Sequence, residues 1–149
     1  MSQFTSRIKR IAISTGGGDA PGLNAVIRAA VLAAHQRGWD AVGIREGYNG
    51  LLMPEHFVEQ GLEGVFPLTR TNVRGITHLG GTILGTTNRG NPLRFPTIDA
   101  DGGVKEIDRS DEVVEKLQEH GIDALIAVGG DGSLAIAHTL AQKGVRVVG

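Results

Sequence analysis

The stretch IAISTGGGD, residues 11–19, decides the fold of this chain. An apolar run leads into three glycines and an aspartate, and the residues that follow favour a helix. Such a run is typical of a strand buried on both faces of a parallel sheet. The glycines permit a sharp turn and let backbone N–H groups come close to a ligand. Residues 125–133, LIAVGGDGS, repeat the pattern near the other end of the chain.

These two turns predict a phosphate site that includes a cation. The helix N-terminus after each turn carries partial positive charge, which suits an anion. Asp19 and Asp131, however, carry the same sign of charge as phosphate. Their presence is explained if a divalent cation lies between carboxylate and phosphate.

The composition excludes several other classes of protein. The chain has 149 residues, 40% of them apolar, which is enough for one ordinary core and indicates one domain. Its 15 basic and 16 acidic residues nearly cancel, so no charge pattern favours nucleic acid or an anionic membrane. The absence of cysteine excludes a disulfide framework and a thiolate zinc site. With no signal peptide and no long apolar run, we expect a soluble protein of the cytoplasm.

Apolar periodicity predicts an α/β architecture. Strands are expected at residues 8–14, 40–45, 123–128 and 145–148, and helices at 22–36, 110–120 and 133–143. Ser110 is suited to cap the second of these helices. The order of elements predicts a Rossmann-like open, mostly parallel sheet with helices on both faces.

The middle of the chain has weaker signals. Residues 57–66 suit a short strand or helix, 75–94 suit loops around a short helix, and 97–99 are read as loop. The sequence then stops inside its last predicted strand. A parallel edge strand without a following helix leads us to expect that this is the front part of a longer protein.

Four motifs give the chain a resemblance to a known family. They are GGDAPGLN at residues 17–24, Gly47-Tyr48, GGTILG at 80–85 and GGDGS at 129–133. In this order, over residues 8–149, the chain resembles the 6-phosphofructokinases. Residues 85–92 look most like the branch that contains both ATP-using and pyrophosphate-using members. The resemblance implies that residues 1–149 form an incomplete N-terminal donor-binding domain and that the C-terminal sugar-phosphate domain is absent.

The resemblance also implies a reaction and its participants. The family transfers a phosphoryl group from ATP, or from pyrophosphate, to the 1-hydroxyl of fructose 6-phosphate with Mg²⁺. The whole protein would be a homodimer or homotetramer. The family's catalytic base is an aspartate in a segment beyond Gly149, so the chain as given would carry the donor site alone. Thr97-Ile98-Asp99 looks superficially like that segment but lies before the donor loop, in the wrong order.

The resemblance also implies roles for individual residues at the positions that match the family's motifs. Gly18 would lie against the donor phosphates and Tyr48 beside the nucleotide. Asn88 and Arg89 would lie at the donor phosphates, with Arg89 neutralising charge in the transition state. In the short bacterial enzymes the arginine directly follows two small residues, whereas here Asn88 intervenes. Structural alternatives are a packing role for Tyr48 and a solvated loop position for Arg89.

The GGDGS motif supplies the rest of the implied donor site. Gly130, Asp131, Gly132 and Ser133 would form the donor loop, with Asp131 holding Mg²⁺. The alternative for Asp131 is to cap the helix that follows, and Asp19 is better suited to capping the first helix than to metal binding.

Position 132 bears on the choice of donor. Pyrophosphate-using relatives normally carry an aspartate there, which would oppose the α-phosphate of a nucleotide. Gly132 removes that obstacle and favours ATP. Ile136 stands where the short ATP enzymes have a small glycine, so the adenosine pocket need not be identical.

Regulation is expected to differ from the short bacterial enzymes. Those use two arginines, one helical turn apart on the first helix, to bind effectors. Here Arg28 matches the first position, but Leu32 stands at the second. The resemblance therefore implies weak or absent regulation of that type.

Other functions remain open from the sequence. The GGDGS motif also occurs in NAD kinases and diacylglycerol-type lipid kinases, but those lack the segments at 18–22 and 80–82. A pyrophosphate-dependent enzyme is a second possibility, and an inactive truncated nucleotide-binding module is a third. The five histidines show no metal-ligand spacing.

Overall fold

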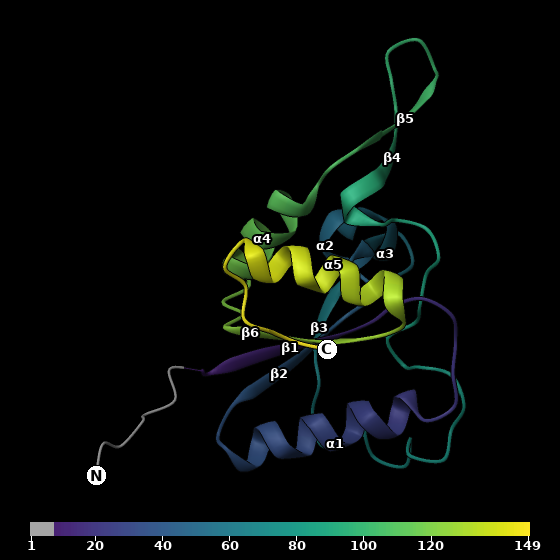
Figure 1. Cartoon of the computed structure of the whole chain (residues 1–149). Helices are drawn as coiled ribbons and strands as arrows, with labels where there is room; N and C mark the ends of the chain where they lie inside the picture. The colour runs from purple at the N-terminus through teal and green to yellow at the C-terminus, as the bar shows by residue number, and fades with distance from the viewer. Residues whose placement is uncertain (1–7) are drawn as a thin grey trace.

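The computed structural model describes residues 8–149, and its centre is a five-stranded sheet in the order β3-β2-β1-β6-β7 (Figure 1). The strands are β1 (Arg10–Thr15), β2 (Asp40–Ile44), β3 (Val65–Pro67), β6 (Ala124–Val128) and β7 (Val147–Val148). All neighbours are parallel except β2 and β3. In the centre, Ile11 of β1 is paired with Ala41 on one side and with Ala124 on the other. The predicted open, mostly parallel sheet is confirmed.

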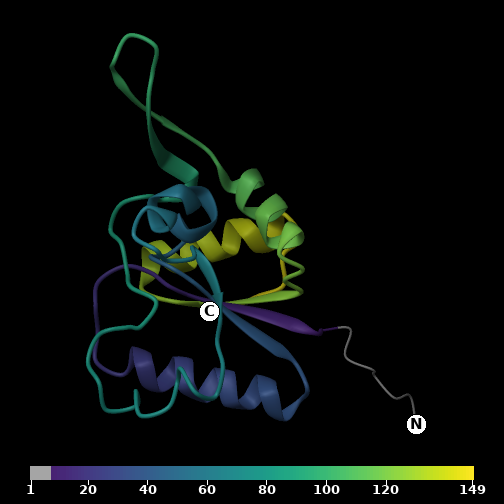
Figure 2. The same cartoon turned by 180° about the vertical axis from the view of Figure 1, so that it is seen from behind.

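Helices cover both faces of this sheet. Figures 1 and 2 show α1 (Leu23–Gln36) on one face and α4 (Ser110–Glu119) with α5 (Asp131–Gln142) on the other, beside the short α2 (Asn49–Leu52) and α3 (Pro54–Val58). Alternate residues of β1 enter different cores: Ile11 and Ile13 pack in the α1 cluster, whereas Ala12 packs in the cluster of α4 and α5. Among the described helices none is long and apolar enough to cross a membrane.

A hairpin projects from the body of the molecule. After the 3₁₀ turn η1 (Pro92–Arg94), strands β4 (Phe95–Ile98) and β5 (Val104–Ile107) pair with each other alone, and both views show them extending away from the sheet. The prediction of a loop at 97–99 is therefore wrong for Thr97 and Ile98. The turn begins only at Asp99, whose side chain accepts hydrogen bonds from the N–H groups of Asp101 and Gly103.

Helix starts also differ from the predictions. Ser110 is the first residue of α4 and not its cap, because its N–H and hydroxyl both donate to Oδ1 of Asp108, at 2.8 and 2.6 Å. Asp19 does not cap α1, whose N-cap is Gly22 in the left-handed conformation. Helix α5 begins two residues earlier than expected, at Asp131, and that residue makes no capping hydrogen bond.

Candidate functional site

The two glycine turns meet at the carboxyl ends of the central strands. Thr15, the last residue of β1, is paired with Val128, the last residue of β6, and the N–H of Gly16 donates to the Val128 carbonyl at 2.9 Å. From this point the chain enters α1 on one face and α5 on the other. The boundary between β1 and β6 is thus the position where the winding of the sheet reverses. Open α/β sheets bind their ligands at such a switch point.

The turns approach each other so closely that a side chain at either of two glycines would collide with a neighbouring residue. A Cβ atom on Gly16 would lie 2.7 Å from Oγ of Ser133. A Cβ atom on Gly129 would lie 2.5 Å from the same oxygen and 2.8 Å from the carbonyl oxygen of Gly16. The absence of side chains at these two positions lets the first turn of α5 sit directly beside the end of β1.

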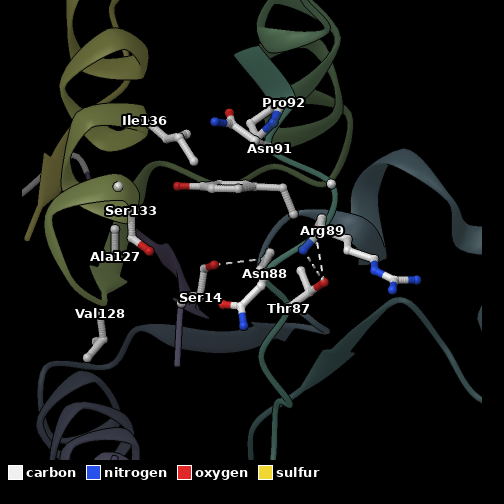
Figure 3. Close-up of a pocket in the computed structure, with 16 residues that line it drawn as sticks. Ser14, Thr87, Asn88, Arg89, Asn91, Pro92, Ala127, Val128, Ser133 and Ile136 are labelled. Atoms are coloured by element: carbon white, nitrogen blue, oxygen red, sulfur yellow. Dashed lines mark hydrogen bonds between the residues drawn. The ribbon is translucent and has the colours of Figure 1, made fainter. Parts of the chain in front are cut away.

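A cavity of about 210 Å³ opens at this switch point. Figure 3 shows two walls facing each other, with Ala127, Val128, Ser133 and Ile136 on one side and Thr87 to Pro92 on the other. The complete lining is Ser14, Gly16, Gly17, Gly47, Tyr48, Thr87, Asn88, Arg89, Gly90, Asn91, Pro92, Ala127, Val128, Gly132, Ser133 and Ile136. Apolar walls with a few hydroxyl and amide groups are typical of a small-molecule site.

Hydroxyl groups at the end of β1 hold the loops that form the cavity. Ser14 donates to the Gly47 carbonyl at 2.9 Å (Figure 3), and the buried Thr15 donates to the Gly85 carbonyl at 2.8 Å. Further along, Oγ1 of Thr87 accepts from the N–H of Arg89 and donates to its carbonyl. These bonds satisfy backbone groups that would otherwise be unpaired and fix the loop from Gly85 to Arg89.

The side chain of Tyr48 packs in the hydrophobic core and also lines the cavity. Its side chain is 5% exposed, and the hydroxyl oxygen is buried without a hydrogen-bond partner among residues 8–149. Burial raises the pKa of this phenol, so the group is neutral at physiological pH. A buried hydroxyl without a partner beside a cavity is free to donate to a ligand there.

The structure brings together part of the predicted donor site. Tyr48, Asn88, Arg89, Gly132 and Ser133 line the cavity. Gly18, Gly130 and Asp131 are exposed and lie outside its lining. The guanidinium group of Arg89 points away from Ser133 in Figure 3 and makes no ion pair with any residue that the structure describes.

The surroundings of Asp131 fit a magnesium ion that is held mainly by phosphate. Its carboxylate is exposed at the start of α5 and forms no hydrogen bond or ion pair within residues 8–149, so it is not committed to capping. No cluster of three metal-ligating side chains occurs in the described part of the chain. Mg²⁺ commonly binds through one or two carboxylates together with substrate phosphates and water, and one free carboxylate meets that requirement.

Sequence reasoning missed Ser14 and gave no role to Pro92. Ser14 lies in a strand that was read only as buried and apolar, and its one signal was a hydroxyl residue inside that run. Pro92 has no local signal, because its place in the lining depends on where the loop crosses the carboxyl ends of the strands.

Comparison with known proteins shows the family of this chain. The family model for phosphofructokinase matches residues 10–149. The chain is 45% identical over 144 residues to ATP-dependent 6-phosphofructokinase 1 of Synechocystis, and 44% identical over 143 residues to ATP-dependent 6-phosphofructokinase 2 of Clostridium perfringens. Each alignment covers 95% of this chain and 37% of the relative, so the chain spans little more than a third of their length.

Solved structures support the same relationship. Phosphofructokinase of Pichia pastoris in the T-state matches all of this chain and 14% of its own, with a TM-score of 0.72 and 32% identity. A pyrophosphate-dependent phosphofructokinase from Marinobacter aquaeolei matches 94% of this chain and 32% of its own, with a TM-score of 0.66, but at 14% identity it shows the fold alone. On the evidence of motifs, fold and family model together, this chain belongs to the phosphofructokinase family.

Proposed function

We propose that the protein to which this chain belongs transfers the γ-phosphoryl group of ATP to the 1-hydroxyl of fructose 6-phosphate. One observation carries the proposal: the two glycine turns and the cavity lie at the switch point between β1 and β6, beside the N-terminus of α5. The first N–H groups of a helix are unpaired within the helix and attract phosphate oxygens. The two bacterial relatives described above, at 45% and 44% identity, are named as ATP-dependent enzymes.

Roles of the chain's own residues follow from their places. The apolar walls at Tyr48, Pro92 and Ile136 exclude water and suit the less polar part of a nucleotide. At 210 Å³ the cavity lies below the roughly 300 Å³ at which pockets for small molecules begin, so a polyphosphate tail would extend beyond it. Gly18 and Gly130 are exposed next to it and can offer backbone N–H groups to that tail. The guanidinium group of Arg89 would turn inward and contact the negatively charged phosphates of this tail.

Asp131 would hold Mg²⁺ between its carboxylate and the phosphates. When bound, the ion would neutralise charge on the transferring phosphoryl group. The carboxylate is already exposed and without a partner among the described residues, so no contact has to break for it to bind the ion.

Gly132 supports ATP over pyrophosphate. This glycine has ordinary backbone angles, and a Cβ atom on it would meet nothing within 4 Å. The fold therefore does not require glycine here, unlike at Gly129. The space that glycine leaves open faces the cavity and would accommodate an α-phosphate, which an aspartate would repel.

A coupled assay of the complete gene product tests the proposal. ATP and pyrophosphate are each supplied with fructose 6-phosphate and Mg²⁺, and formation of the bisphosphate is measured. We expect turnover with ATP and little with pyrophosphate. Turnover with pyrophosphate but not with ATP would mean that pyrophosphate is the phosphoryl donor. Turnover with neither would support an inactive nucleotide-binding module. We further propose a cytoplasmic, glycolytic role for the whole protein. We also propose that it is a homodimer or homotetramer, and sedimentation of the complete protein would test this oligomeric state.

A further inference from the structure

Arg109, which lies outside the cavity, connects two parts of its lining: a first wall at Tyr48 and a second wall at Pro92, both distinct from the side formed by β6 and α5. It immediately precedes α4, and its backbone and side chain contact η1, α2, β4 and α4 itself. We propose that Arg109 is a positioning residue that fixes the separation of Tyr48 and Pro92 and so determines how tightly the donor binds. The identity of the ligand as a phosphoryl donor rests on the proposed function, whereas the contacts of Arg109 do not depend on it.

The first wall is held through α2. The N–H of Leu52 donates to the carbonyl of Tyr48 at 3.1 Å, and the carbonyl of Leu52 accepts from Nη2 of Arg109 at 3.0 Å. Tyr48 directly precedes this four-residue helix, so the Arg109 contact holds the far end of the segment that carries the tyrosine. A helix of one turn has little stability of its own and depends on such contacts.

The second wall is held through the backbone and the ring of Phe95. The N–H of Arg109 donates to the Pro92 carbonyl at 2.6 Å. The guanidinium carbon lies 4.5 Å from the centre of the Phe95 ring, which is itself 6% exposed. Pro92 lines the cavity, and Phe95 follows three residues later, so both contacts fix the same wall.

The guanidinium group is itself held in one orientation. Nε and Nη2 of Arg109 both donate to the carboxylate of Glu112, each at 2.7 Å, and this pairing lowers the pKa of Glu112. The Arg109 side chain is 21% exposed, so the pair is more shielded than the Arg94–Glu106 pair, where the arginine is 72% exposed. Bidentate pairing fixes the plane of the guanidinium and leaves Nη2 aimed at Leu52.

Two arginine variants of the complete protein separate positioning from general stability. Arg109→Gln removes the contacts with Leu52, Phe95 and Glu112 but keeps the backbone bond to Pro92. Arg94→Gln is the matched control, because it breaks an exposed arginine–glutamate pair between η1 and β5, and neither residue of that pair lines the cavity. We expect Arg109→Gln to raise the KM for the donor about tenfold, the value of one lost charge-assisted hydrogen bond. The KM for fructose 6-phosphate and kcat should stay near those of the parent protein and of Arg94→Gln.

A second measurement does not depend on catalysis. Nitration of Tyr48 by tetranitromethane, located by peptide mass mapping, reports how well the ring is covered. We expect slow nitration in the parent protein and in Arg94→Gln, and faster nitration in Arg109→Gln. If Arg109→Gln does not fold, Arg109→Lys keeps a cation but cannot contact Glu112 and Leu52 in the same planar arrangement, and it should show the same change to a smaller degree.

The outcomes distinguish this inference from the proposed function. Unchanged donor KM and unchanged nitration in a folded Arg109→Gln protein would overturn the positioning role. A loss of thermal stability with equal effects on kcat and on both KM values would also overturn it, in favour of a purely structural role. If the parent protein turns over neither donor, the proposed function fails, and faster nitration of Tyr48 would still support the connection between the walls.

Discussion

Oγ of Ser133 lies only 2.5 Å from the position that a Cβ atom on Gly129 would take. The serine belongs to the first turn of α5 and the glycine to the turn just before it. Their contact places the helix N-terminus against the end of β1, where Gly16 completes the same packing. The close approach of α5 to the end of β1 therefore depends on the absence of side chains at these two glycines.

Gly129→Ala should destabilise the protein. The added methyl group would meet Ser133 and the Gly16 backbone, and overpacking of this kind costs about 1–3 kcal/mol. Urea unfolding measures the loss of free energy. Gly80→Ala is the control, because a Cβ atom there meets nothing within 4 Å and the backbone angles are ordinary. Equal stability of the two variants would contradict the packing argument.

Gly132→Asp should lower the preference for ATP as donor without unfolding the protein. The space at this position admits a side chain, but a carboxylate in the cavity would repel the α-phosphate by several kcal/mol, roughly a hundredfold or more in kcat/KM for ATP. Gly132→Ser is the control that adds volume without charge. Steady-state kinetics with both donors test this, and unimpaired use of ATP by Gly132→Asp would show that position 132 does not select the donor.

Asp131→Asn should abolish most turnover while leaving stability almost unchanged. The side chain has no partner within residues 8–149, so its replacement breaks no contact that the structure describes. Loss of the carboxylate that would hold Mg²⁺ should lower kcat by a factor on the order of 100 to 10,000. Asp111→Asn alters another first-turn aspartate, on α4, which pairs with Lys143 at 2.6 Å, and should retain activity. The expected signature is a kcat effect that excess Mg²⁺ partly relieves.

Asp123 should contribute stability that acid removes. Its Oδ2 accepts hydrogen bonds from the N–H groups of Lys9 and Arg10, at 2.8 and 3.0 Å, and these bonds lower the pKa of the carboxyl group. A carboxyl whose pKa is lower in the folded state stabilises the fold above its unfolded pKa, near 3.9, and loses that contribution as the pH falls through the folded value.

Asp123→Asn should therefore be less stable than the parent protein at pH 7, with the difference shrinking as the pH falls below about 4. Urea unfolding at neutral and acidic pH measures both differences. Glu59→Gln, at an exposed position, serves as the control. A difference that stays constant across this pH range would mean that the charge of Asp123 is not involved.

Regulation by nucleotide or phosphoenolpyruvate at α1 should be weak. Nη1 of Arg28 donates to the Val73 carbonyl at 2.9 Å, so this cation is occupied within the chain, and Leu32 offers no second charge. We expect the rate of the complete protein to change by less than about twofold with ADP or phosphoenolpyruvate, below the range typical of allosteric coupling. A strong response would mean either that an effector site lies elsewhere in the protein or that Arg28 leaves the Val73 carbonyl and binds the effector.

The sequence by itself determined the strands β1, β2, β6 and β7, the main helices and the two glycine turns, but not the strands β3, β4 and β5. In residues 11–19 and 125–133 the apolar runs and glycines are local features, and local backbone preference was enough to predict where each strand ends. The resemblance to the 6-phosphofructokinases, and not these local features, implied Tyr48, Asn88, Arg89, Gly132 and Ser133, all of which line the cavity. Helix starts at Ser110 and Asp131 were misjudged, because short polar side chains suit several positions around a helix N-terminus.

Only the tertiary structure decided how these parts meet. The pairing of β1 with β6 joins segments more than a hundred residues apart and puts Gly16 beside Ser133. Ser14 and Pro92 enter the cavity, and Arg109 joins its first and second walls, through contacts between residues distant in the sequence. No local pattern encodes such contacts, because they depend on strand order and on the packing of side chains from separate elements.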